Sequence, residues 1–144
     1  MAYIFNHDLD RIRQALGDVP AINGETKDQD LVEIARAWNA GETPILCGQP
    51  QAMGHGLNLQ GAASHLCWYT LPWDLELYDQ TNRRLYRAGQ TQRVVVHRLL
   101  ARGTLDETVA RVLSGKKRTQ DALFTALKAQ PRHKRGRSER SFHT

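Results

Sequence analysis

The chain has 144 residues, of which 40% are hydrophobic and 24% are charged, so it is expected to form one compact domain and not a disordered polymer. No apolar run reaches the roughly 18 residues of a transmembrane helix, and acidic residues at Asp8 and Asp10 interrupt any signal-peptide core. Two cysteines are too few for a disulfide framework, which fits a reducing compartment.

The net charge of +5 is distributed unevenly along the chain. Residues 132–140 hold five basic side chains and one acidic side chain, which is +4 of that total. We therefore expect residues 129–144 to form a basic, disordered tail, separate from a folded unit at 1–128. The tail is either a solvated end or a segment that binds nucleic-acid phosphates. Its candidate DNA-binding residues are Arg132, Lys134, Arg135 and Arg137.

The first third of the chain alternates between short apolar runs and amphipathic segments. Ala2–Phe5 predicts a short strand, and Asn6 can cap a helix whose apolar repeat stops at Gly17. Val19–Ile22 predicts a second strand. A further helix follows, ending near Gly41.

The start of that second helix carries a capping pattern. Thr26 and Gln29 stand three positions apart ahead of an apolar repeat, which predicts a capping box. The helix is followed by a third predicted strand, Thr43–Cys47. The connection after it, Gly48–Ser64, shows no long helical repeat, and such connections are usually functional or disordered.

The remaining elements continue the alternation. His65–Thr70 predicts a fourth strand, Asp74–Ala88 a helix, and Arg93–Leu100 a fifth strand. Thr104 and Glu107 then predict a second capping box at the start of the last helix. Helices between short strands imply right-handed crossovers, so the predicted fold is a three-layer α/β domain with a parallel sheet of about five strands and helices on both faces.

The long connection is rich in glycine. Gly54 and Gly56 flank His55, and Asn58 follows shortly afterwards. Paired glycines let backbone amides approach a phosphate or adopt positive φ, but a plain structural turn gives the same pattern. His55 lacks a second ligand at a helical or hairpin spacing, so no metal site is predicted. Both cysteines lie in apolar strands, which indicates inert buried thiols.

One face of the predicted Asp74–Ala88 helix is polar. Gln80, Arg84 and Arg87 fall within a narrow arc, opposite the apolar positions. Two arginine forks beside an amide form a donor array suited to polyphosphate, although a solvated helix face is the plain alternative. The apolar positions that should be buried are Leu75, Tyr78 and Leu85.

Together these segments resemble the C-terminal, second RecA-like lobe of SWI/SNF-type DNA translocases of helicase superfamily 2, and most of all the small phage and bacterial members. Residues 54–60, GHGLNLQ, resemble motif V, and residues 80–90, QTNRRLYRAGQ, resemble motif VI. Residues 3–12 resemble motif IV, and the likeness extends over roughly residues 1–128. Motif VI departs from the commoner eukaryotic form at Arg83, Tyr86 and Ala88, but it keeps both arginines of the pattern.

The resemblance implies a RecA-like, P-loop NTPase-type fold and a mechanism. In this family two lobes clamp ATP with Mg²⁺ between them, and the second lobe directs arginines at the γ-phosphate. The matching catalytic residues are Arg84 and Arg87. The resemblance places Gly54, Gly56 and Asn58 in the loop that couples the nucleotide to DNA. It gives Gln80 and Gln90 a supporting role at the helix and the cleft, and it implies a bacterial or phage-infected cytoplasm.

The chain itself carries only half of such a site. No Gly-x-x-x-x-Gly-Lys-Ser/Thr string occurs, and the acidic pair Asp106–Glu107 opens a helix instead of ending an apolar strand. We therefore expect a truncated lobe or a split subunit that is inactive alone, with a first lobe in trans and DNA as partners and no membrane. A DNA-binding or regulatory module derived from such a lobe is the alternative.

Overall fold

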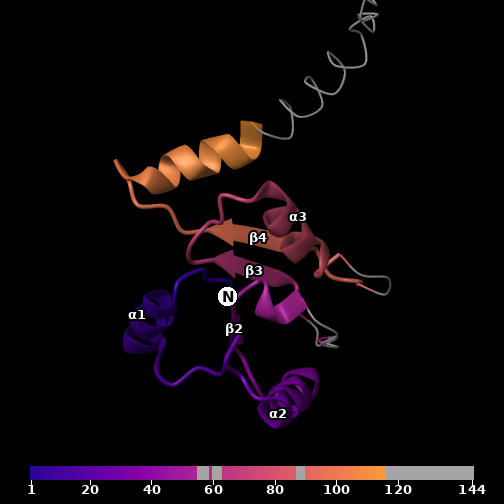
Figure 1. Cartoon of the computed structure of the whole chain (residues 1–144). Coiled ribbons are helices and arrows are strands. Elements are labelled where there is room, and N and C mark those ends of the chain that lie inside the picture. The colour runs from indigo at the N-terminus through magenta and orange to yellow at the C-terminus, as the bar shows by residue number, and fades with distance from the viewer. Residues whose placement is uncertain (55–58, 60–62, 87–89, 116–144) are drawn as a thin grey trace, which may run out of the picture.

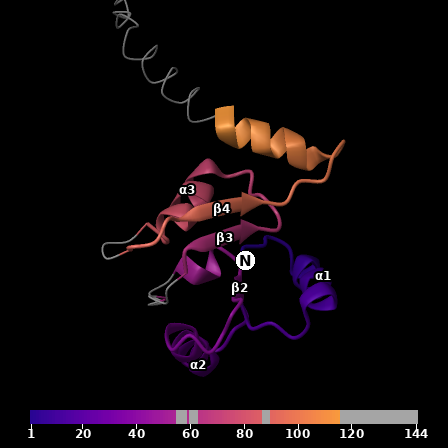
Figure 2. The ribbon, with the colours of Figure 1, turned by 180° about the vertical axis from the view of Figure 1, so that it is seen from behind.

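The computed structural model describes residues 1–54, 59, 63–86 and 90–115. Helices and strands alternate along these residues, as Figures 1 and 2 show from opposite sides. None of the described helices has the length and apolar content needed to cross a membrane. The elements are α1 (Asn6–Leu16), β1 (Ala21–Ile22), α2 (Asp28–Asn39), β2 (Cys47–Gly48), the 3-10 helix η1 (Ala52–Gly54), β3 (His65–Trp68), α3 (Leu75–Arg83), β4 (Val95–Arg98) and a last described helix, 105–115, drawn in orange in Figure 1.

The strands pair in parallel, as predicted. β1 pairs with β2, and β3 pairs with β4, with His65 opposite Val95. Ala2 joins the two pairs because it makes parallel bridges to both Gly48 and Trp68. The described residues therefore contain four strands, and the expected strand at Ala2–Phe5 contributes only these bridges. The five-strand count is not confirmed.

Alternation along the strands divides the core between the two faces of the sheet. On one face, Tyr3 and Cys47 pack against Leu9 and Ile12 of α1. The other face holds a second cluster of buried side chains, with α3 packed against it. Its buried members are Ala2, Leu66, Trp68, Leu71, Val109 and Leu113. Helices thus cover both faces of the parallel strands, as the sequence predicted.

Helix α3 is anchored to the sheet through Trp68. The indole Nε1–H of Trp68 donates to Oδ1 of Asn82 at 2.9 Å, and its ring stacks on Tyr78 with centroids 5.2 Å apart. The predicted apolar residues Leu75, Tyr78 and Leu85 do pack against this cluster. The helix is shorter than expected, because it begins after the capping residue Asp74 and ends at Arg83, not Ala88.

Two helix starts differ from the predicted capping. The hydroxyl of Thr26 accepts the backbone N–H of Asn23 at 2.9 Å, so it closes a turn ahead of α2, whose cap is Lys27. The predicted box of Thr26 with Gln29 is therefore wrong. In α1 the cap is Phe5, and Asn6 is already helical. Capping motifs and turns use the same side chains, which is why spacing alone did not separate them.

Asp8 connects the beginning of α1 to the end of β3. Its carboxylate is buried and accepts the N–H of Phe5 at 2.9 Å and the hydroxyl of Thr70 at 2.7 Å.

Asp8→Ala should lower the free energy of unfolding by about 1–3 kcal/mol, because two donors would be left without their acceptor. Urea denaturation measures the effect. The control is Asp10→Ala, an exposed acid on the same helix, which should stay within about 0.5 kcal/mol. Equal urea midpoints for the two variants would show that the hydrogen bonds accepted by Asp8 do not stabilise the fold.

Candidate functional site

The connection after β2 folds back over the strand that it leaves. The N–H of Met53 in η1 donates to the carbonyl of Gln49 at 3.1 Å, and its side chain lies against Gly48. A Cβ added at Gly48 would stand only 2.8 Å from Cγ of Met53 and closer still to its sulfur. A side chain at position 48 would therefore require the Met53 side chain to move, one residue before the glycine-rich segment begins.

Gln49 ties the same connection to the beginning of the chain. Its side-chain Nε2 donates to the carbonyl of Ile4 and to Oδ1 of Asn6, both at 3.1 Å. The motif IV-like segment thus meets the connection that leads to the motif V-like segment, at the carboxyl end of β2. Sequence reasoning assigned Gln49 no role. Its position directly after a strand and before Pro50 was the only available signal.

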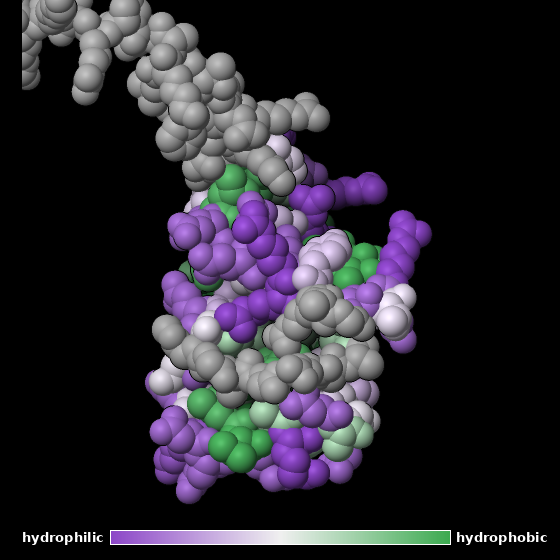
Figure 3. All heavy atoms as spheres, turned by 90° about the vertical axis from the view of Figure 1, so that its right-hand side faces the viewer, coloured by the Kyte–Doolittle hydropathy of each residue, from purple (hydrophilic) through white to green (hydrophobic). Residues whose placement is uncertain are grey.

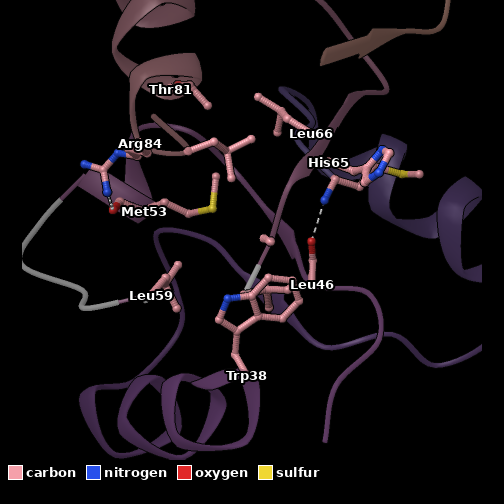
Figure 4. Close-up of a pocket in the computed structure, with 11 residues that line it drawn as sticks. Trp38, Leu46, Met53, Leu59, His65, Leu66, Thr81 and Arg84 are labelled. Carbon is pink, nitrogen blue, oxygen red and sulfur yellow. Dashed lines mark hydrogen bonds between the residues drawn. The ribbon is translucent and has the colours of Figure 1, made fainter. Parts of the chain in front are cut away.

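Arg84 joins this connection to the end of α3. Its Nη1 donates to the carbonyl of Met53 at 2.6 Å and its Nη2 to the carbonyl of Gly54 at 3.1 Å. Figure 4 shows the guanidinium turned toward the backbone of Met53. The side chain is half-buried. Gly54 of the motif V-like segment and Arg84 of the motif VI-like segment are 30 residues apart in sequence, yet one arginine fork bridges them.

The two described glutamines of the predicted site lie in different settings. Gln80 is exposed on α3 and donates to Oε1 of Glu76, one turn earlier, at 3.0 Å. Gln90 donates to the carbonyl of Ala63 at 3.1 Å, so it holds the segment before β4 against the segment before β3. Gly54 acts through its carbonyl and not through positive φ. The other predicted residues lie outside the described part of the chain: Gly56, Asn58, Arg87, Arg132, Lys134, Arg135 and Arg137.

A small apolar cavity lies next to Arg84. Its volume is about 90 Å³, and Trp38, Leu46 and Met53 line it together with Leu66 and other residues (Figure 4). Nucleotide-sized sites are several times larger, about 300 Å³ or more. This cavity is therefore part of the packing and not a nucleotide pocket.

The end of the sheet where β3 and β4 begin faces the viewer in Figure 3, where hydrophilic side chains surround separate apolar patches.

Burial shifts the pKa of three titratable side chains of the described residues. Burial raises the pKa of the Cys47 thiol and of the Cys67 thiol, which keeps both protonated. Burial likewise raises the pKa of Tyr3. Within the described ranges no three His, Cys, Asp or Glu side chains form a metal-binding group.

Comparison with known proteins agrees with this geometry. The helicase conserved C-terminal domain family matches residues 4–89. Protein p41 of Acyrthosiphon pisum secondary endosymbiont phage 1 is 35% identical over 133 residues, which is 89% of this chain and 28% of that protein. The chromatin-remodeling ATPase INO80 of Cryptococcus neoformans is 31% identical over 103 residues, or 71% of this chain and 6% of that protein.

A solved structure supports the same fold. The C-terminal part of the Fun30 ATPase domain superposes with a TM-score of 0.69 over 78% of this chain and 38% of that chain, at 20% identity. This likeness shows a RecA-like lobe. The chain spans less than a third of the two sequence relatives described above, so it corresponds to one part of much longer proteins.

The bridge made by Arg84 can be tested without any ligand. Arg84→Ala should lower the free energy of unfolding by about 1.5–3 kcal/mol, since it removes charged hydrogen bonds to two carbonyls. It should also raise amide exchange in residues 49–54. Arg83→Ala is the matched control, because its side chain is exposed on the preceding position. If both variants leave exchange in residues 49–54 unchanged, the bridge does not order the connection.

Proposed function

Because the chain belongs to the helicase conserved C-terminal domain family, of the SWI/SNF type, we propose that it acts as the second lobe of an ATP-dependent DNA translocase or helicase. In this proposal it supplies Arg84 and Arg87 to an ATP site that it shares with a first lobe. The observation that carries the proposal is the double hydrogen bond from Arg84 to Met53 and Gly54. It brings the two motif-like segments together at one place.

The residues present fit half of a nucleotide site. ATP with Mg²⁺ would supply the scissile phosphoanhydride and part of the charge neutralisation, through a phosphate-binding loop that this sequence lacks. The arginines would stabilise the charge that spreads over the γ-phosphoryl oxygens in the transition state. Arg84 suits this role because its fork is already oriented by two carbonyls, and a fixed donor needs no reorganisation during the reaction.

DNA would be bound mainly through its phosphates. The basic tail at 129–144 supplies most of the net positive charge, which favours contacts that do not depend on base sequence. The same charge also supports the second candidate function, a non-catalytic DNA-binding or regulatory module. That candidate is favoured by the missing phosphate-binding string. The two differ in whether the arginines matter once a first lobe is present.

Hydrolysis in the presence of a first lobe is the decisive measurement. The chain alone should show no ATP turnover above background. Mixed with a family first lobe that carries the phosphate-binding loop, it should restore DNA-stimulated hydrolysis. Arg87→Ala should then reduce the rate by about 10³-fold or more, as removal of an arginine finger does. Arg83→Ala should leave the rate unchanged. Turnover by the isolated chain, or full activity of Arg87→Ala, would refute the assignment.

The contribution of the tail can be measured separately. Replacing Arg132, Lys134, Arg135 and Arg137 with alanine should weaken duplex binding equally for unrelated sequences. The slope of log K against log salt should become shallower by up to about 0.9 for each DNA phosphate that the variant no longer neutralises. Binding titrations at several salt concentrations give both quantities. An unchanged slope would place the DNA contacts on the folded lobe instead.

A further inference from the structure

An open cavity lies at the carboxyl ends of β3 and β4. Its volume is about 710 Å³, and Arg84 does not line it. The beginning of α1 forms one wall, and the segments that follow the two strands form the others. In Figure 1 both strands point toward the side of the molecule on which α1 lies. Ligands of open α/β sheets bind at this end of the strands, so the cavity is a candidate site that the ATP-site proposal does not use.

The wall formed by α1 carries two exposed aromatic rings. The rings of Phe5 and His7 form an offset stack, nearly parallel at 7°, with centroids 5.3 Å apart. Phe5 is 52% exposed and the side chain of His7 is 63% exposed, so much of both rings is accessible to a ligand. Buried Asp8 holds the pair in place, because it accepts the N–H of Phe5 and lies 3.5 Å from Nε2 of His7. A flat aromatic surface fixed in this way is suited to stacking a nucleobase.

Two guanidinium groups reach the same cavity from different elements. Arg11 lies on α1, and Arg98 is the last residue of β4. Both are exposed, and neither has a hydrogen-bond or ion-pair partner among the residues that the structure describes. The acids of the cavity are already engaged, since Asp8 is buried and Asp106 accepts the N–H of Ala101 at 3.1 Å. The two arginines therefore keep their donors for a phosphate.

We propose that this cavity binds one unpaired nucleotide of a DNA strand, with the base stacked on Phe5 and His7 and the adjoining phosphates bound by Arg11 and Arg98. The inference rests on the proposed function for DNA as the partner and deepens it by naming the form of DNA. Neighbouring base pairs cover the faces of a base inside a duplex, so only an unpaired base can reach the rings. Stacking tolerates any base, in agreement with binding that does not depend on sequence.

An apolar peptide is the competing occupant of the cavity. Leu99 and Leu100 also line it, and both are exposed. Such a peptide would leave Arg11 and Arg98 without acceptors, whereas a nucleotide engages the rings and both guanidinium groups at once. The charge on two sides of the cavity therefore favours the nucleotide.

The experiment compares two strands that differ only in their bases. The full chain, with neither a first lobe nor ATP, is titrated with a short oligodeoxythymidylate and with an abasic strand of the same length. Both strands carry the same phosphates, so any contribution of the basic tail cancels in the ratio of the two affinities. One aromatic stacking contact changes affinity by about 5- to 150-fold, so the wild type should prefer the thymidylate at least about fivefold.

The rings are tested by two replacements and one matched control. Phe5→Leu should remove most of the preference for thymidylate and leave α1 intact, because Phe5 caps the helix through its backbone. His7→Ala, at an exposed position, should lower the preference as well. Tyr86→Leu is the control, since Tyr86 is an exposed aromatic residue beyond the end of α3 that does not line the cavity. It should keep the wild-type ratio.

The arginines are tested by their effect on affinity. Arg11→Gln and Arg98→Gln should each weaken thymidylate binding severalfold and make its salt dependence shallower, because each removes a phosphate contact. Arg83→Gln, which removes an exposed charge from α3, should have a smaller effect. Equal effects of all three replacements would show that the cavity does not hold the phosphates.

Melting curves without DNA show which variants are folded. The proposal is overturned if the wild type does not prefer thymidylate, which is the result expected of a peptide-binding cavity. It is also overturned if the preference survives both Phe5→Leu and His7→Ala in folded protein, or if Tyr86→Leu removes it equally. Failure of the proposed function is seen separately, in hydrolysis with a first lobe, which these binding ratios do not involve.

Discussion

The backbone of Ala2 is the contact on which the sheet depends. Its N–H donates to the carbonyl of Cys67 at 2.7 Å, and its carbonyl accepts the N–H of Tyr69 at 2.8 Å. On the opposite side, Gly48 pairs with the residues that flank Ala2. These backbone bonds join the β1–β2 and β3–β4 pairs, and the methyl side chain of Ala2 is fully buried. The connection that carries Met53 starts from the same Gly48.

Hydrophobic alternation predicted the order and type of these elements because burial on two faces leaves a clear pattern in sequence. The core positions of α3 followed from the helical period for the same reason. The first strand was overestimated because Phe5 is apolar, whereas its N–H leaves the sheet to bond with Asp8. An apolar residue can cap a helix as readily as it extends a strand, and only the hydrogen-bond partner distinguishes the two.

Of the predicted site residues, the structure describes Gly54, Gln80, Arg84 and Gln90, and it joins Gly54 to Arg84 by a hydrogen bond. The acceptors of Arg84 could not be predicted, since they are the backbone carbonyls of Met53 and Gly54 and every residue carries a carbonyl. The crowding at Gly48 could not be predicted either, because it comes from the side chain of Met53, which folds back from five positions later.

The anchoring of Arg84 bears on why this position holds arginine and not lysine. A guanidinium presents five N–H donors in a fixed plane, and the carbonyls of Met53 and Gly54 engage two of them. An ammonium would keep the charge but could not hold both carbonyls in one plane. Under the proposed function, the two carbonyls would fix the orientation of the guanidinium, and transition-state stabilisation depends on an orientation set before the reaction begins.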